Sequence, residues 1–332
     1  MQQVMRQKSG YWPHFLALGY ALGGFALGLW LITRAPGWPT LPGMLLLAHA
    51  MVIGAYLVHE CAHNTIFLNN RYNAWLGELL DWLVGSAYGS YEGIRHKHFR
   101  HHVDRADVVA FDYRPMLERH PVLLRLVQAL EWAYIPAVDL LMHSLVLILP
   151  FRLESRRSRR GRVIAVLFTR ILFFAWLGWV SPWALLWYGV AYMLFLHVMR
   201  FMDVHQHTYE VFETLEGERG VEAEQFDRSY ENHNTYSNLI SLKHPWMNLF
   251  TLNFGYHNAH HVRPTAPWYA LPRLHREQFG DDRSQILFVS NLLRSYHRYR
   301  VARVLNADPA NMDVGNGRDF IGVVGVSFLT AH

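Results

Sequence analysis

Residues 41–63 decide the fold, and they read LPGMLLLAHAMVIGAYLVHECAH. An uncharged apolar run, Leu41–Val58, leads directly into His59-Glu60-Cys61-Ala62-His63. A run of about 18 apolar residues is long enough to cross the hydrocarbon core of a bilayer. In a helix, His59 and His63 lie one turn apart on the same face, so their imidazoles can bind one metal ion. The segment predicts a membrane-spanning helix that ends in a pair of metal ligands.

Three further apolar runs have the same character. Residues 15–32, 163–180 and 183–201 are long enough to span a bilayer, and short Pro- and Gly-containing turns pair the four runs into two hairpins. The glycines of the first run are spaced for close packing against another membrane helix: Gly19, Gly23, Gly24 and Gly28. We therefore predict membrane helices near residues 14–33, 41–60, 162–180 and 182–202.

The distribution of basic residues predicts the orientation. Arginines crowd residues 152–162, and Arg6 and Lys8 precede the first run, whereas the two hairpin turns carry only Arg34. The positive-inside rule places both termini and the central segment in the cytoplasm. Residues 122–151 are apolar but interrupted by Glu131 and Asp139, which predicts helices in the membrane interface. Arg170, inside the third run, is expected to have a structural role.

The composition excludes several classes of protein. The chain has 332 residues, 52% of them hydrophobic and 17% charged, and a net charge of only +5. No basic run interleaved with aromatic residues suggests nucleic-acid binding. The single cysteine, Cys61, excludes an intrachain disulfide and a cluster held by the chain's own cysteines. Histidine is the outlier: there are 21, and polar groups near lipid are costly unless they are functional.

Two more histidine clusters follow the HECAH motif. The sequence RHKHFRHH places three histidines at i, i+3 and i+4, and FGYHNAHH repeats that spacing. We call residues 59–63, 98–102 and 257–261 the first, second and third histidine boxes. Under the orientation above, all three lie on the cytoplasmic side. Since loop charge and histidine spacing are independent observations, their agreement predicts a metal centre at that face.

The three boxes around two membrane hairpins resemble the membrane fatty acid desaturase superfamily, over essentially the whole chain to about Pro272. The resemblance implies two iron ions held above the bilayer and one more histidine after the fourth helix. In the sequence RFMDVHQHTYE this role is assigned to His207, with His205 as the alternative. Asp203 and His233 are predicted to support the ligands. The predicted iron ligands are His59, His63, His98, His101, His102, His207, His257, His260 and His261.

The resemblance also implies the chemistry. Two ferrous ions and dioxygen would generate an oxidant that removes hydrogen from a fatty-acyl chain, and neutral imidazole suits iron. Loss of a second hydrogen gives desaturation, and loss of CO₂ from a free fatty acid gives a terminal 1-alkene. A free acid would need a cation for its carboxylate; the candidates near the boxes are Arg95, Arg100, Arg105 and Arg263.

Two alternatives remain open at the level of sequence. One is a lipid or alkyl hydroxylase of the same superfamily. The other is an intramembrane zinc metalloprotease, because HECAH fits H-E-x-x-H with Glu60 as general base. The protease leaves the second and third boxes unexplained. Counting metals would separate the two classes: two irons or one zinc per chain.

Electrons must come from outside the chain. No G-x-G-x-x-G follows a predicted strand, so a ferredoxin, a rubredoxin or a similar donor with its reductase is expected. Four arginines near the end of the chain form a basic stretch that could dock an acidic donor or bind lipid headgroups: Arg294, Arg298, Arg300 and Arg303.

Together these observations predict an all-α integral membrane protein that forms one domain over residues 1–332. It has four transmembrane helices in two hairpins, interfacial helices, and a cytoplasmic helical cap from residues 92–160 and 203–332 that holds a di-iron site. The predicted location is a bacterial inner membrane, with the active site on the cytoplasmic face.

Overall fold

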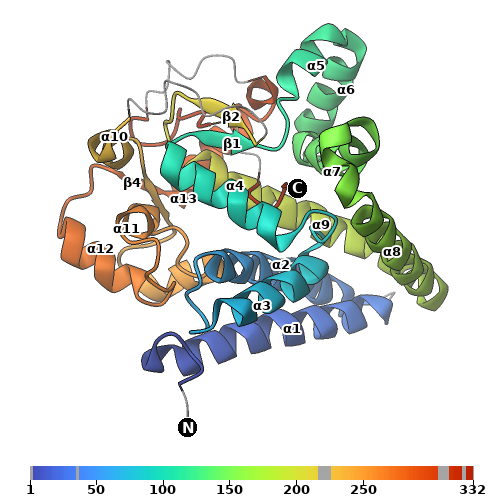
Figure 1. Cartoon of the computed structure of the whole chain (residues 1–332), viewed down its shortest axis with the longest axis horizontal. Helices are drawn as coiled ribbons and strands as arrows, with labels where there is room; N and C mark the ends of the chain where they lie inside the picture. The colour runs from blue at the N-terminus through green and yellow to red at the C-terminus, as the bar shows by residue number, and fades with distance from the viewer. Residues whose placement is uncertain (1–2, 35–36, 216–225, 306–313, 324–326, 332) are drawn as a thin grey trace. The chain divides into compact units, whose positions relative to one another are not determined.

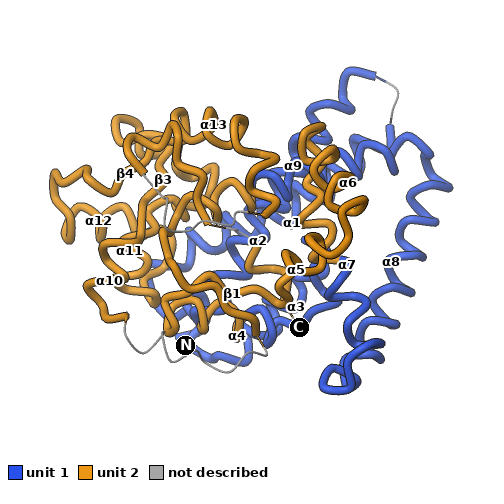
Figure 2. The backbone as a smooth tube through the Cα atoms, turned by 90° about the horizontal axis from the view of Figure 1, so that it is seen from above, with its two compact units in different colours: residues 1–94, 144–198, 332 blue, residues 95–143, 199–331 orange. Residues whose placement is uncertain are grey.

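A computed structural model of the chain describes residues 3–34, 37–215, 226–305, 314–323 and 327–331. The predicted cap therefore includes some positions outside the described residues. The chain divides into two compact units, shown in Figure 2. Unit 1 contains residues 1–94, 144–198 and 332, and unit 2 contains residues 95–143 and 199–331.

The structure is mostly helical, as predicted (Figure 1). Unit 1 contains η1 (Lys8–Gly10), α1 (Tyr11–Thr33), α2 (Thr40–Ala62), α3 (Asn70–Val84), η2 (Glu154–Arg159) and α8 (Arg160–Val180). Three helices contain residues of both units: α4 (Tyr91–Asp104), α7 (Ala137–Arg152) and α9 (Pro182–Val204).

Unit 2 combines short helices with short strands. Its helical segments are α5 (Arg114–Arg119), α6 (Pro121–Trp132), α10 (Arg228–His233), η4 (Pro245–Thr251), α11 (His257–Val262), α12 (Leu271–Phe279), α13 (Val289–Arg298) and η5 (Ala302–Val304). Its strands are β1 (Asp107–Val109), β2 (Phe212–Thr214), β3 (Ser237–Leu239) and β4 (Ile286–Phe288).

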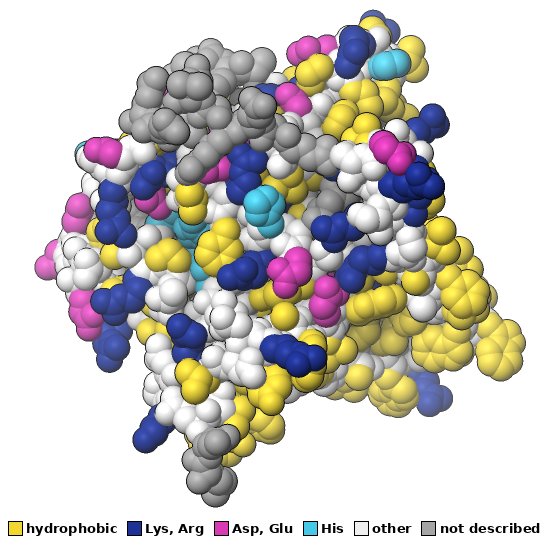
Figure 3. Space-filling model, viewed as in Figure 1, with side chains coloured by type: hydrophobic (Ala, Val, Ile, Leu, Met, Phe, Trp, Pro, Cys, Tyr) yellow, Lys and Arg dark blue, Asp and Glu magenta, His cyan; other side chains and the backbone are white. Residues whose placement is uncertain are grey.

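Four helices are long and apolar enough to cross a membrane, which confirms the predicted fold class. With their flanking turns they cover Lys8–Thr33, Thr40–Ala62, Glu154–Val180 and Pro182–Val204. The side chains along α8 are largely exposed, and Figure 3 shows hydrophobic side chains gathered over this helix. Large apolar side chains stay exposed on such a helix when lipid, rather than water, surrounds them.

The α1–α2 hairpin packs through glycine. A Cβ atom on Gly28 would lie 2.8 Å from the Leu47 nitrogen, and one on Gly43 would lie 2.5 Å from the Leu31 Cβ. At Gly19 and Gly23 a Cβ atom would meet nothing within 4 Å. The close helix contact therefore depends on one face of α1, and only part of the predicted glycine pattern contributes to it.

Helix α3 was not predicted, although its local signals are present. The Asn69 side chain accepts a hydrogen bond from the Arg71 backbone N–H, which caps the first turn. Gly85 ends the helix in the left-handed conformation, at φ 87°. Mixed apolar and charged residues between these caps hide the helix from a search for uninterrupted apolar runs.

Residues 122–151 form α6 and α7 in place of a membrane span, and neither is among the four apolar helices. The two acidic residues that interrupt this stretch have a partner within unit 2. A nitrogen of the buried Arg200 lies 2.6 Å from a Glu131 oxygen and 3.6 Å from an Asp139 oxygen. The charges form a buried ion-pair cluster, and removing one member would leave the others uncompensated.

Two small parallel sheets depart from the all-α prediction. Strand β1 pairs with β2, with Asp107 opposite Phe212, and β3 pairs with β4, with Ser237 opposite Ile286. Each strand has only three residues, so no alternating pattern was visible in the sequence. The β1–β2 pair joins the chain that follows the second box to the chain that follows His207, which aligns two parts of the site.

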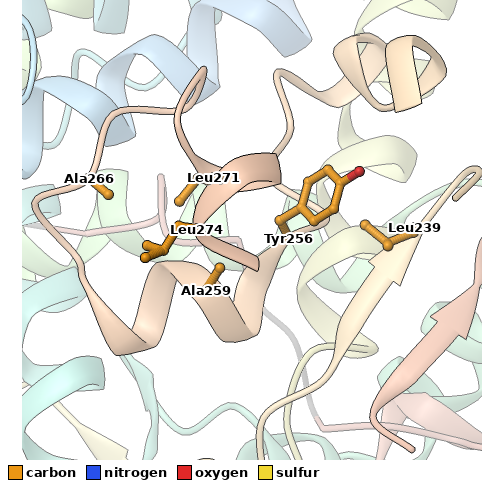
Figure 4. Close-up of a cluster of buried hydrophobic side chains, with 6 residues drawn as sticks. All are labelled: Leu239, Tyr256, Ala259, Ala266, Leu271 and Leu274. Atoms are coloured by element: carbon orange, nitrogen blue, oxygen red, sulfur yellow. The ribbon is translucent and has the colours of Figure 1, made fainter. Parts of the chain in front are cut away.

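The third box lies on a helix that needs outside support. Six residues are too few for a stable isolated helix. Figure 4 shows how α11 is held: Ala259 faces Leu271 and Leu274 of α12, and Tyr256 and Leu239 belong to the same buried cluster. Because Ala259 lies on the opposite face of the helix from the three histidines, this packing turns the histidines away from the apolar cluster.

Candidate metal centre

Four imidazoles from three segments of unit 2 converge on one point. His101 comes from α4, His207 follows α9, and His257 and His261 come from α11; one nitrogen of each lies within 4.8 Å of the other three. The His207 Nε2 atom lies 3.0 Å from that of His101 and 2.8 Å from that of His257. The His257 and His261 Nε2 atoms are 3.1 Å apart.

In two of these rings, the hydrogen bond made by Nδ1 shows that Nε2 is the nitrogen available to bind a metal. His101 Nδ1 lies 2.9 Å from the Ala106 carbonyl oxygen, and His261 Nδ1 lies 2.8 Å from a Glu231 oxygen. Both are acceptors, so each Nδ1 carries the proton and each Nε2 directs its lone pair toward the other rings. Lone pairs that converge in this way repel one another unless a cation lies between them.

The spacing fits a transition metal. With metal–nitrogen bonds of about 2.1 Å, neighbouring ligands at right angles lie about 3.0 Å apart, which matches the three Nε2 distances. Imidazole donors suit iron, among other metals. Burial also keeps the rings neutral: it lowers the pKa of His101 to about 3 and lowers the pKa values of His207 and His257 well below 6.5. These residues therefore fit a bound metal ion.

A second group of three histidines in unit 2 also brings its Nε2 atoms together. The His102 Nε2 atom lies 3.1 Å from that of His98 and 3.0 Å from that of His260. The second and third boxes thus contribute to both groups. In unit 1, the rings of His59 and His63 are 4.7 Å apart at the end of α2, and both are buried. The neighbouring Glu60 accepts a hydrogen bond from the Thr65 hydroxyl at 2.6 Å.

Glu231 contacts the histidine cluster, although no motif in the sequence indicates it. It accepts the hydrogen bond from His261 Nδ1 at 2.8 Å and lies 3.3 Å from an Arg105 nitrogen. Burial by itself raises the pKa of Glu231, but the bond from His261 and the Arg105 charge lower it overall. The carboxylate is therefore ionised and holds the ring of His261 in place.

His233 and His205 lie apart from the clustered histidines. His233 is exposed, with Nδ1 2.7 Å from the Ser229 carbonyl oxygen. The motif ENHNTYS predicts a supporting role for His233. The residue that contacts a clustered histidine is instead Glu231, two positions earlier. His205 is buried, with Nδ1 2.8 Å from the Phe201 carbonyl oxygen and Nε2 3.1 Å from an Arg303 nitrogen. Between the two assignments made from sequence, the structure brings His207 into the cluster.

A cavity of about 60 Å³ adjoins the clustered histidines within unit 2. Asp203 and Lys97 line it on the polar side, and Phe328 and Val323 on the apolar side. The Lys97 ammonium group donates to the Ser327 carbonyl at 2.8 Å. That bond fixes part of the C-terminal segment, residues 320–323 and 327–331, beside the histidines. Asp203 lines this cavity, its support of a ligand histidine stays a prediction, and the C-terminal segment is an unpredicted part of the wall.

The structure revises several predictions about arginines. Arg100 lies 2.6 Å from an Asp104 oxygen and also pairs with Glu213, and Arg105 pairs with Glu231, so carboxylates of the chain already neutralise both. Arg303 was predicted to belong to a basic docking surface, and this is wrong: it is 1% exposed and donates to the Ile321 carbonyl at 2.7 Å. A long side chain can satisfy its charge inside the protein, which charge counting along a sequence does not reveal.

Comparison with known proteins identifies the family of the chain. It is 24% identical over 275 residues to a protein described as omega-6 fatty acid desaturase, chloroplastic, from Brassica napus, covering 76% of this chain and 56% of the relative. A protein with the same description from Glycine max is 24% identical over 276 residues, covering 76% and 59%. The chain spans less than two thirds of the length of these relatives. The sequence model described as fatty acid desaturase matches residues 36–288, a range that contains all three boxes and His207. The chain therefore belongs to the fatty acid desaturase family.

Proposed function

We propose that this protein is a membrane-bound di-iron oxidoreductase that uses dioxygen to remove hydrogen from a fatty-acyl chain. The single observation that carries the proposal is the convergence of the Nε2 atoms of His101, His207, His257 and His261. Membership of the fatty acid desaturase family supports both the metal and the substrate class.

The two groups of histidines divide the ligands between two irons. His101, His207, His257 and His261 would hold one iron. For the other iron we propose His98, His102 and His260, completed by His59 and His63 of the first box. Glu231 would orient His261, and Asp203 would act from the cavity wall.

Bound iron would supply electrons to dioxygen and so produce an oxidant strong enough to attack an alkyl C–H bond. The chain's own residues have other tasks. The buried rings keep their Nε2 lone pairs unprotonated, Glu231 holds the His261 proton on Nδ1, and Phe328 and Val323 limit the water beside the site. Electrons would come from an external donor such as a ferredoxin or rubredoxin with its reductase.

The reaction that we favour is desaturation, because the matched relatives are described as desaturases. Oxidative decarboxylation of a free fatty acid to a 1-alkene and hydroxylation begin with the same removal of hydrogen, so they are the other outcomes of the test. The protein would act as a multi-pass protein of a bacterial inner membrane, with its site on the cytoplasmic face.

The test is metal and product analysis of the purified protein. We expect two irons per chain and, with a fatty-acyl substrate, oxygen and a reducing system, an alkene of unchanged length by mass spectrometry. An alkene one carbon shorter would assign decarboxylation, and an alcohol would assign hydroxylation. Active protein that contains one zinc and no iron would overturn the proposal and favour the metalloprotease alternative.

A further inference from the structure

A second cavity lies within unit 1, among the membrane helices. Its volume is about 290 Å³, just below the usual range for small-molecule sites. Its wall is formed mainly by aromatic and aliphatic side chains, among them Tyr88, Phe174, Leu185, Tyr188 and Tyr192. All belong to unit 1, whereas the four-histidine cluster belongs to unit 2.

One charged residue, Arg170, lines this cavity. Arg170 is at the midpoint of α8, which runs from Arg160 to Val180. A charge at this depth is costly, and an intramembrane arginine that faces a cavity usually has a function. Its guanidinium donates to the Trp82 carbonyl in the last turn of α3 and contacts the Tyr188 hydroxyl. The guanidinium also lies over the Trp82 ring, 5.9 Å from its centroid, and none of these partners carries a negative charge.

Several other arginines of the chain have a carboxylate partner. In unit 1, Arg162 lies 2.5 Å from a Glu78 oxygen and Arg157 lies 3.0 Å from a Glu154 oxygen. In unit 2, Arg100 and Arg105 are paired with carboxylates. Among the described residues, Arg170 has no carboxylate partner. Its planar guanidinium is suited to bind a carboxylate with two parallel hydrogen bonds.

We infer that this cavity binds a free fatty acid, with its carboxylate at Arg170 and its chain among the aromatic side chains. The volume accommodates a single alkyl chain and excludes a two-chain phospholipid. Phospholipid headgroups also lie at the bilayer surface, whereas Arg170 is at the middle of a membrane helix. The ligand named for this cavity is a free acid, not a thioester or a lipid ester.

Glycine provides a matched pair of variants to test the site. Gly189 lines the cavity, and a Cβ atom there would meet nothing within 4 Å. The Cβ atom of Gly189→Phe therefore has room, the ring is expected to fill the cavity, and replacing glycine favours the helix. Gly23 on α1 is exposed, also has nothing within 4 Å, and does not line the cavity. Gly23→Phe is thus the same change in another membrane helix.

The experiment measures binding of radiolabelled laurate to the purified full chain in detergent, with unlabelled 1-dodecanol and dilauroyl phosphatidylglycerol as competitors. We expect saturable binding of one laurate per chain in the wild type and in Gly23→Phe. Gly189→Phe should lose binding. Arg170→Met should bind laurate at least tenfold more weakly and no longer prefer it to 1-dodecanol.

Three results would overturn the inference: laurate affinity unchanged in both Gly189→Phe and Arg170→Met, equal loss in Gly23→Phe, or displacement of laurate by phosphatidylglycerol as effectively as by laurate itself. Iron content of the same samples separates this inference from the proposed function. Laurate binding by protein that contains no iron would refute the proposed oxidoreductase but support the fatty-acid site. Two irons per chain without laurate binding would support the oxidoreductase but refute the fatty-acid site.

Discussion

Single side chains decide whether an imidazole can act as a ligand. His261 presents its Nε2 to the cluster because Glu231 accepts the proton on Nδ1, and Glu231 in turn is balanced by Arg105. His205, two positions from His207, is equally buried, yet Arg303 engages its Nε2. The partner of each ring, more than its spacing in the sequence, assigns its role.

Replacing Glu231 should weaken metal binding. Glu231→Gln keeps the size of the side chain but removes the charge that holds the His261 tautomer, so we expect about 10–100-fold weaker iron binding. Metal analysis after dialysis against graded chelator concentrations measures this. Glu277→Gln is the control, because Glu277 is exposed and, among the described residues, its ion pair is with Arg273 on the surface. Equal iron retention in the two variants would contradict the role given to Glu231.

Variants of His207 and His205 distinguish a metal-binding histidine from a structural one. His207→Ala should lose iron and turnover, because a nitrogen of His207 lies within 4.8 Å of nitrogens of three other histidines. His205→Ala should retain iron but lower stability by about 1–3 kcal/mol, since Arg303 loses a buried partner. Iron content and thermal unfolding of both variants provide the test, and iron loss only in His205→Ala would reverse the assignment.

At the scale of elements, close backbone contacts fix the hairpin and the C-terminal segment. Gly28 and Gly43 let α1 and α2 approach until a Cβ atom has no room. Gly322, at φ 82°, lets the C-terminal segment pass so close to α9 that an added Cβ would lie 1.9 Å from the Val204 carbonyl oxygen. Neither contact tolerates a side chain.

The hairpin predicts a contrast between two glycines on one helix. Gly28→Leu should separate α1 from α2 and lower the thermal stability of the protein in detergent by several degrees. Gly23→Leu should have little effect, because a Cβ there meets nothing within 4 Å. Thermal melting curves of the two variants, measured side by side, test this expectation. The same melting temperature for both would show that the α1–α2 hairpin does not depend on the close contact at Gly28.

The C-terminal segment gives a second contrast. Gly322→Ala combines positive-φ strain with a clash, whereas Gly280→Ala has positive φ (56°) and open space around the added atom. We expect about 1–3 kcal/mol of strain in both, and a further loss of stability in Gly322→Ala alone. Limited proteolysis should cleave the C-terminal segment faster only in Gly322→Ala, because the wall of the cavity beside the histidines would be displaced.

At the scale of the whole molecule, the four apolar helices and the arginine distribution predict the sides of the membrane. Cys61, the single cysteine, is fully buried, so an impermeant maleimide should not label the wild type. Trp38 lies between α1 and α2 and is 86% exposed, so Trp38→Cys should react from outside the cell. Ser229→Cys, exposed on α10, should react only after the cytoplasmic face is opened. Labelling of both from one side would invalidate the cytoplasmic assignment.

The sequence by itself determined the features that depend on local periodicity. Apolar run length set the four long helices, and the i, i+3, i+4 spacing set which histidines share a helix face. Tertiary structure alone decided which isolated histidine joins the cluster, that Glu231 orients His261, that Arg303 is buried, and that residues 320–323 and 327–331 line the site. These depend on contacts between segments up to about 230 residues apart, such as Lys97 with Ser327. Packing brings such segments together, and no short-range pattern in the chain encodes it.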